Sequence, residues 1–296
     1  MPLIVEAPVA QRDRRLESRL QPVLYRKAVL SALLALIFLA FFGTLGLSAR
    51  MFPKNYDWRY RVISNLLSPR DNPSHYWLPA CGIIVAAVLM LPFAGYLRRN
   101  LEIASPRAAR VSAGALIAGI VALICACLVV PQHVHDVFGI RRLHEFIARS
   151  AAGFIAIGML NACWCAWKGF RKNLLQGRLF WTWSLVTLLP LAGIFFSECL
   201  LGITRLHPAW AMPIRTVLRH SVFWHLGFWE WSGSAAVFVF LCAAVLLIPA
   251  ANGLRKSQRD HCNLAAASAQ ELSKMRLMSR APCSTRTIST PSASSR

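Results

Sequence analysis

The chain has 296 residues, of which 56% are hydrophobic and only 15% are charged. An ordinary soluble domain is about 45–50% apolar. The excess here falls into six runs of about 20 residues or more with few or no charges. A soluble core helix needs one apolar stripe, and porin strands are about ten alternating residues long, so a soluble globule and a porin-type barrel are both excluded. The sequence predicts an all-α, multi-pass integral membrane protein with six transmembrane helices.

Positive charge is in large excess. Lys and Arg number 33 against 12 Asp and Glu, and the formal net charge is +21. In a soluble protein this balance would suggest nucleic-acid binding. Here the basic residues lie in loops and tails, without zinc-finger spacing and without interleaved aromatic residues, so membrane topology and anionic lipid explain them better. We therefore predict the lipid bilayer, and not nucleic acid, as the partner.

The six runs give six predicted helices, each long enough to cross about 30 Å of hydrocarbon at about 1.5 Å per residue. In chain order they are Ala28–Ala49, Leu78–Leu97, Val111–Pro131, Phe146–Trp167, Trp181–Ile203 and Phe228–Pro249. The first is long and lacks a convincing cleavage site, so we expect an uncleaved anchor. The predicted transmembrane domain, 28–249, follows a basic segment, 1–27. It precedes a basic tail, 250–296, that is too polar to offset the entropy of ordering and is expected to be disordered.

The placement of Lys and Arg predicts the orientation. Of the 33, 22 lie in the two tails and in the second and fourth connections, 10 lie in the other three connections, and Arg149 lies within a helix. Positive charge accumulates on the cytoplasmic side of a membrane. We therefore expect a cell-membrane protein with both termini in the cytoplasm and three hairpins that open outward.

Seven of the eight histidines and half of the acids lie on this predicted outer side. Loops are polar in any case, so the bias has a structural explanation as well as a functional one. It indicates a candidate polar extracytoplasmic site at the outer ends of the third to sixth helices. The candidate ligand-binding residues are His135, Asp136, His144, Glu145, Arg149, Glu198, His225 and Glu230.

Glu198 is the most unusual of these residues, because it lies about one turn inside the fifth helix, near the negative end of the helix dipole. An acid in hydrocarbon costs up to about 3 kcal/mol on insertion scales, so it should be neutral, solvated or paired. Arg149 lies at a similar depth and is the expected bidentate partner, in a pair that is either functional or architectural. The alternative is that Arg149 bonds Glu145 one turn earlier. Glu145 and Glu230 begin predicted helices, where the dipole favours an acid.

No metal or cofactor is assigned. A metal site can be drawn from four residues between the third and fourth helices, namely His133, His135, Asp136 and His144. The chain has no His-Glu-x-x-His motif, and the later outer His and Glu residues recur at intervals of five, which spreads them around a helix. No histidine lies inside an apolar run, which disfavours haem. Neither a glycine-rich phosphate loop nor a Gly-x-Ser-x-Gly elbow is present.

The first outer loop contains turn-forming sequence. Ser68-Pro69 and Asn72-Pro73 favour turns, and Asp71 can close an Asx turn, so we expect a compact loop that caps the bundle.

Three segments carry a family resemblance: Ile63-Ser64-Asn65-Leu66 followed by Asn72-Pro73, His144-Glu145 before the fourth helix, and Trp229-Glu230-Trp231 at the start of the sixth. In these the chain resembles a broad group of six-helix membrane proteins of unknown biochemistry, related to the damage-regulated autophagy modulators and the FGF-receptor-activating proteins. Such proteins commonly have Asp or Glu where Asn65 stands. The resemblance implies a helical bundle with an outward polar face and no established reaction, so no catalytic residue is carried over.

The leading functional prediction is binding or translocation of a small polar molecule or lipid headgroup at the outward site, with Glu198 and Arg149 at its floor. One alternative is a metal-dependent, hydrolase-like membrane enzyme that uses outer histidines as ligands and Glu145 or Glu230 as general base. Another is an architectural or partner-binding protein whose polar pair fixes helix register. The catalytic residues, cofactor and oligomeric state are not assigned.

Overall fold

Six membrane-length helices make up most of the part of the chain that the structure describes. The computed structural model describes residues 25–129, 143–206, 213, 216–217 and 220–248, and within these residues all regular structure is helical. Six helices are long and apolar enough to span a membrane, which confirms the predicted fold class. The first span consists of α2 (Lys27–Phe38), a π-helical turn (Leu39–Gly43) and α3 (Thr44–Arg50). The others are α5 (Trp77–Leu101), α6 (Pro106–Leu128), α8 (Leu143–Arg171), α9 (Gly177–Leu206) and α11 (Leu226–Leu247).

The helices are longer than their apolar cores. Helix α6 begins at Pro106, five residues before the predicted start, because proline at the first helical position gives up no hydrogen bond and Ser105 precedes it in an extended conformation. Helix α8 continues past the predicted Trp167 to Arg171. There Asn173 adopts a left-handed conformation, with φ 54°, and the Leu174 N–H bonds the Gly169 carbonyl at 2.9 Å, which terminates the helix.

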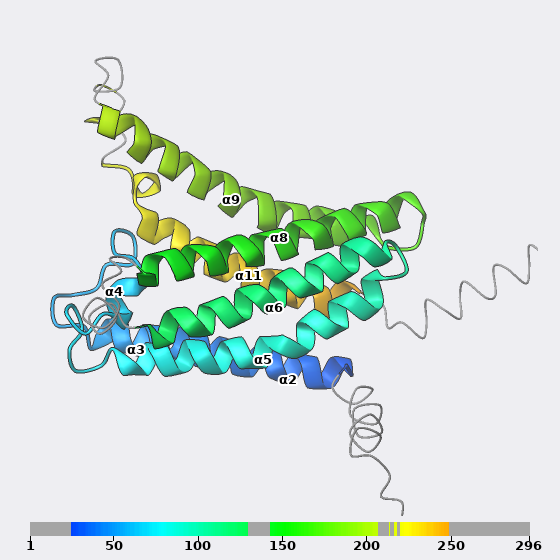
Figure 1. The fold of residues 1–296 in the computed structure, drawn as a ribbon, viewed down its shortest axis with the longest axis horizontal. Coiled ribbons are helices and arrows are strands. Elements are labelled where there is room, and N and C mark those ends of the chain that lie inside the picture. Colours follow the sequence, from blue (N-terminus) through cyan, green and yellow to red (C-terminus); the bar gives the residue numbers. More distant parts are fainter. Residues whose placement is uncertain (1–24, 130–142, 207–212, 214–215, 218–219, 249–296) are drawn as a thin grey trace, which may run out of the picture. The chain divides into compact units, whose positions relative to one another are not determined.

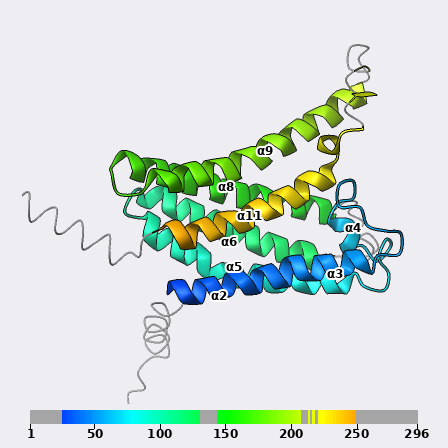
Figure 2. The ribbon, with the colours of Figure 1, turned by 180° about the vertical axis from the view of Figure 1, so that it is seen from behind.

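The helices contact one another mainly in chain order. Helix α2 packs on α5, α5 on α6, α6 on α8, α8 on α9 and α9 on α11, and α11 returns to α2. The six spans therefore form a ring, whose members run alternately in opposite directions (Figures 1 and 2). Outward-facing apolar side chains such as Leu39, Phe195 and Leu246 are 63–72% exposed, as expected for a surface in contact with lipid.

Small residues bring α6 and α8 together. A Cβ atom on Gly158 would lie 2.6 Å from Leu116 Cγ, and one on Gly119 would lie 2.6 Å from Ile155 Cγ1. Ser112 Oγ donates a hydrogen bond of 2.7 Å to the Gly158 carbonyl across the same interface. Close backbone approach and interhelical hydrogen bonds are the usual means of helix association where no hydrophobic driving force acts between helices.

The two ends of the bundle differ in charge and structure. We call the end with residues 51–76 and the starts of α8 and α11 the loop end, and the end with residues 98–110 and 168–178 the basic end. At the basic end, Tyr96 Oη donates to the Ile248 carbonyl at 3.4 Å, and Tyr25 lies beside Gly95. Both ends of the described chain thus lie on one side, as six spans require. That this side is cytoplasmic stays a prediction.

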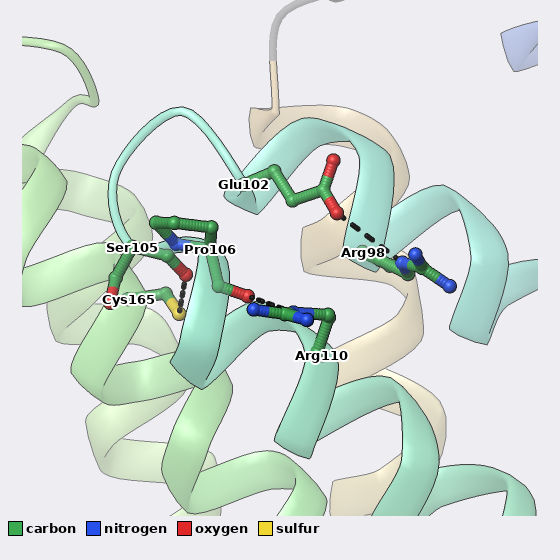
Figure 3. Close-up of polar contacts among 6 residues, drawn as sticks. All are labelled: Arg98, Glu102, Ser105, Pro106, Arg110 and Cys165. Atoms are coloured by element: carbon green, nitrogen blue, oxygen red, sulfur yellow. Dashed lines mark hydrogen bonds and ion pairs between the residues drawn. The ribbon is translucent and has the colours of Figure 1, made fainter.

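The α5–α6 turn at the basic end is held by local polar contacts (Figure 3). Arg98 Nε lies 3.3 Å from Glu102 Oε1, and Arg110 Nε donates to the Pro106 carbonyl at 3.3 Å. The Cys165 thiol of α8 donates to the Ser105 carbonyl at 3.8 Å, which ties α8 to this turn. The tail predicted to be disordered, 250–296, and residues 1–24 of the basic N-terminal segment lie outside the described residues.

Candidate polar site at the loop end

The first loop is compact and attached to the first span. The Asn72 side chain is fully buried, and its Nδ2 donates to Ser48 Oγ at 2.9 Å and to the Leu66 carbonyl at 3.1 Å. Asp71, expected to close an Asx turn, accepts a hydrogen bond of 3.2 Å from Asn65 Nδ2. The Asx turn is made instead by Asp57, whose Oδ1 accepts from the Arg59 N–H at 3.0 Å. The bond to Ser48 holds the loop against the end of α3, and the other bonds fold the loop onto itself.

Four residues join this loop to α11, and we call them the loop latch: Tyr56, Ile63, Glu230 and Trp231. Glu230 Oε2 accepts a hydrogen bond of 2.8 Å from the Ile63 N–H. Tyr56 Oη donates to the carbonyls of Arg61 and Val62 at 3.0 and 3.1 Å, and it accepts from Trp231 Nε1 at 3.1 Å. A carboxylate and an indole from one helix thus fix the position of a loop about 170 residues earlier in the chain.

Glu230 was expected to begin a helix, where the dipole favours an acid, but in the structure it binds the first loop. Helix α11 begins at Leu226, so Glu230 lies beyond its first turn, where the dipole is less favourable to an acid. Its hydrogen-bond partner is a backbone N–H of the first loop. This bond uses Oε2, and within the described residues no hydrogen bond to Oε1 is formed.

Tyr56 acts in the latch as a neutral hydroxyl. The pKa of Tyr56 is raised to about 12, mainly by burial; the neighbouring Glu230 carboxylate acts in the same direction, and the hydrogen bond from Trp231 and the charge of Arg61 act in the opposite one. The hydroxyl therefore keeps its proton at neutral pH. It can therefore donate to the loop carbonyls at pH values well below its pKa.

His225 and its neighbours bring the start of α11 against the loop. The His225 ring meets the Tyr60 ring edge-on, with centroids 4.6 Å apart. A Cβ on Gly227 would lie 2.7 Å from the Arg61 carbonyl carbon, so only glycine allows the helix to approach the loop backbone this closely. The Arg61 guanidinium lies over the Phe52 ring, 5.1 Å from its centroid. His225 is therefore part of the contact between loop and helix.

His144 joins α8 to α6. It is 8% exposed, and its Nδ1 lies 2.8 Å from the Ala126 carbonyl. That carbonyl is in the last turn of α6, where main-chain oxygens lack partners within the helix. A carbonyl can only accept, so Nδ1 carries the proton, and in the neutral ring Nε2 is an acceptor. His144 is a buried inter-helix contact at the loop end.

Arg149 lies on a stripe of α8 whose burial changes along its length. Met159 and Cys163 of this stripe are buried, and Cys163 Sγ contacts Thr187 Oγ1 of α9 at 3.4 Å. Ala152 and Arg149, about two and three turns nearer the loop end than Met159, are exposed. The cause is that α9 diverges from α8 towards the loop end (Figures 1 and 2).

Burial and the hydrogen bond from the Ile63 N–H dominate the surroundings of Glu230 in α11, and the positive charge of Arg149 on α8 has a smaller influence on this carboxylate. Glu145, one turn before Arg149, is exposed and lies in the first turn of α8, where the dipole favours an acid. Glu198 lies in α9, but its side chain is outside the description. The predicted Arg149–Glu198 pair therefore stays a prediction.

Three of the remaining candidates, His133, His135 and Asp136, lie between residues 130 and 142, outside the described residues. Among the residues that are described, no group of three or more His, Cys, Asp and Glu is placed to hold a metal ion. The metal-site hypothesis that involves the 130–142 segment stays untested. Comparison with known proteins found no matching family model, curated protein or solved structure.

Proposed function

We propose that this membrane protein binds or translocates a small polar molecule or a lipid headgroup at the loop end, reached between α8 and α9. The observation that carries this proposal is a buried carboxylate, Glu230 of α11, that is influenced by the positive charge of Arg149 on α8, a span that is not its neighbour in the ring. Charged groups at membrane depth are costly, and where they occur they commonly mark substrate or ion pathways. Within membrane-spanning helices, such charges favour a binding role.

The chemistry of the two residues fits a zwitterionic group. Glu230 is fixed by the Ile63 N–H through Oε2, and its second oxygen, Oε1, is an acceptor suited to an ammonium group. The guanidinium of Arg149 suits a phosphate or carboxylate, which it can bind through two parallel hydrogen bonds. The exposed stripe formed by Arg149 and Ala152 gives such a group a route to Arg149 from the membrane.

Binding is tested with the full chain in a non-ionic maltoside detergent. The probes are phosphatidylethanolamine and its soluble headgroup, glycerophosphoethanolamine, each titrated while thermal unfolding is followed. We expect a rise in the unfolding midpoint, and a tenfold or greater loss of apparent affinity in Arg149→Gln and Glu230→Gln. Glutamine at position 230 keeps an oxygen for the Ile63 N–H, so the loop should remain attached.

The matched controls are Arg98→Gln and Glu102→Gln, which remove the same charges at the basic end. Equal affinity of all four variants, or no response to either probe, would contradict the proposal. A response to the lipid alone identifies a lipid headgroup as the ligand, and a response to both probes identifies a small polar molecule. Both results support binding at the site.

An architectural role is the second candidate, and a specific observation favours it. Glu230 and His144 each bond a backbone group of another segment, Ile63 N–H and the Ala126 carbonyl. If these residues only fix the helices and the loop, Glu230→Leu should lower the free energy of unfolding, while neither probe changes the unfolding midpoint of the wild-type protein.

The orientation belongs to the same proposal. The described residues of the basic end, together with residues 25–27, carry ten Lys and Arg and one acid, which supports a cytoplasmic position for that end and an outward position for the site. Reporter domains fused to the carboxyl terminus test this, because a reporter that is active only outside the cytoplasm should be inactive there. The kinship with the six-helix group named above rests on sequence resemblance alone.

A further inference from the structure

The basic end has far more positive charge than its own carboxylates can balance. Over residues 25–27, 98–110 and 168–178, ten Lys and Arg stand against Glu102 alone. Glu102 is already paired with Arg98 (Figure 3). An end of a membrane protein with this imbalance attracts anionic lipid, at about 1 kcal/mol for each cation near the surface.

Several of these cations are bound to the protein itself. Arg98 pairs with Glu102, and Arg110 donates to the Pro106 carbonyl. Lys172 Nζ donates to the Ala104 carbonyl at 3.4 Å. These contacts hold the α5–α6 turn and its junction with α8, so these three cations already have partners within the protein.

Two cations of α8 are held differently. Trp164, Trp167, Lys168 and Arg171 have the spacing i, i+3, i+4 and i+7, which places them on one face of the helix. We call this the Trp–cation face. The two indole rings lie 4.8 Å apart, with Lys168 Nζ 5.0 Å from the Trp164 centroid and Arg171 Cζ 5.2 Å from that of Trp167.

The rings hold both cations on the same face at the end of a span, and within the described residues neither cation is in an ion pair. A ring face occupies one side of a guanidinium or ammonium group and leaves donors for an anion. Indole rings are also typical of the headgroup level of a bilayer.

An exposed apolar stripe leads from this face towards the middle of the membrane. Ile157, Leu160 and Trp164 follow one another at intervals of three and four residues and are 45%, 39% and 47% exposed. They continue the Trp–cation face along the same side of α8. A stripe of this kind provides a surface for an acyl chain whose headgroup lies at the cations.

We propose that the Trp–cation face binds an anionic phospholipid. The phosphate lies between Lys168 and Arg171, and an acyl chain runs along Trp164, Leu160 and Ile157. Charge complementarity determines the kind of lipid, because two adjacent cations without a carboxylate favour a headgroup with a net negative charge over a zwitterionic one. This site lies at the end opposite to the loop latch and does not depend on the function proposed there.

The test is native mass spectrometry of the full chain in a non-ionic detergent, titrated with phosphatidylglycerol or phosphatidylcholine. We expect phosphatidylglycerol to bind more tightly. The double variant Lys168→Gln/Arg171→Gln should lose about tenfold to thirtyfold of the apparent affinity for phosphatidylglycerol, the factor that two cations at a bilayer surface supply. The charge-preserving Lys168→Arg/Arg171→Lys should retain it.

The matched control is Arg107→Gln/Arg110→Gln, which removes the same charge from exposed positions of the same end. If it weakens phosphatidylglycerol binding as much as the α8 variant does, the attraction is diffuse and the site is refuted. Equal binding of the two lipids by the wild type refutes it as well. So does displacement of phosphatidylglycerol by millimolar inorganic phosphate, since the apolar stripe would then contribute nothing.

Discussion

The loop latch makes a quantitative prediction for Tyr56→Phe. The substitution removes one hydroxyl and keeps the ring, so the edge contacts with Phe52 and Trp231, at 5.6 and 6.2 Å between centroids, should persist. The substitution removes the hydrogen bond that Tyr56 Oη accepts from Trp231 Nε1. It also removes the bond that this hydroxyl donates to two carbonyls of the loop, at 3.0–3.1 Å. Each hydrogen bond contributes about 0.5–1.5 kcal/mol net, so the free energy of unfolding should fall by about 1–3 kcal/mol.

Reversible unfolding in mixed detergent micelles measures this loss, and proteolysis in the native state shows whether the first loop detaches first. Tyr60→Phe is the matched control, because the Tyr60 ring lies in the same loop and its hydroxyl bonds none of the described residues. We expect it to change stability by less than about 0.5 kcal/mol. Equal losses in the two variants would refute the latch, as would an absence of coupling between Tyr56→Phe and Trp231→Phe in a double-mutant cycle.

Three further predictions concern packing, the loop and pH. Gly158→Ala should cost about 1–3 kcal/mol by forcing α6 from α8, whereas Gly153→Ala, with open space around its Cβ, should not destabilise; both are read by thermal unfolding. Asn72→Ala should lower the unfolding free energy by about 1–3 kcal/mol through two lost hydrogen bonds, and Asn161→Ala, which loses only a bond within its own helix, by less. Because the pKa of Tyr56 rises from 10.0 to about 12, stability should fall as pH rises through this interval. Tyr56→Phe should remove that part of the pH dependence, and a flat profile in the wild type would contradict it.

The spans could be predicted from the sequence because the membrane imposes a minimum length on every apolar run. The ends of the spans could not, since they depend on residues that membrane depth does not constrain. Pro106 starts α6 by the geometry of its ring, and Asn173 follows the last turn of α8 with a left-handed backbone. Neither residue belongs to a hydrophobic run, so a search for such runs passes over both. Proline at the first helical position and asparagine just after the last turn are nevertheless recognisable signals of helix ends.

The site was predicted less completely, because its partners are backbone atoms. Glu230 bonds the N–H of Ile63, and His144 bonds the carbonyl of Ala126. No side-chain pattern marks either partner, as every residue except proline has the same N–H and carbonyl. Tyr56 was missed for a related reason, since its two acceptors are carbonyls of its own loop. One feature of the sequence did indicate a contact between loop and helix. It was the presence of a turn-forming first loop together with Trp229-Glu230-Trp231 at the start of the sixth span.

The latch and the proposed binding site share Glu230, and this makes them interdependent. A ligand ammonium at Oε1 would draw electron density from the carboxylate and weaken the bond that Oε2 accepts from the Ile63 N–H. Glu230→Gln separates the two functions, because glutamine retains one acceptor for the loop and loses the charge that attracts the ligand. Near-native stability of this variant together with loss of ligand response would show that the negative charge serves binding. A loss of stability as large as that of Glu230→Leu would show that it serves the loop.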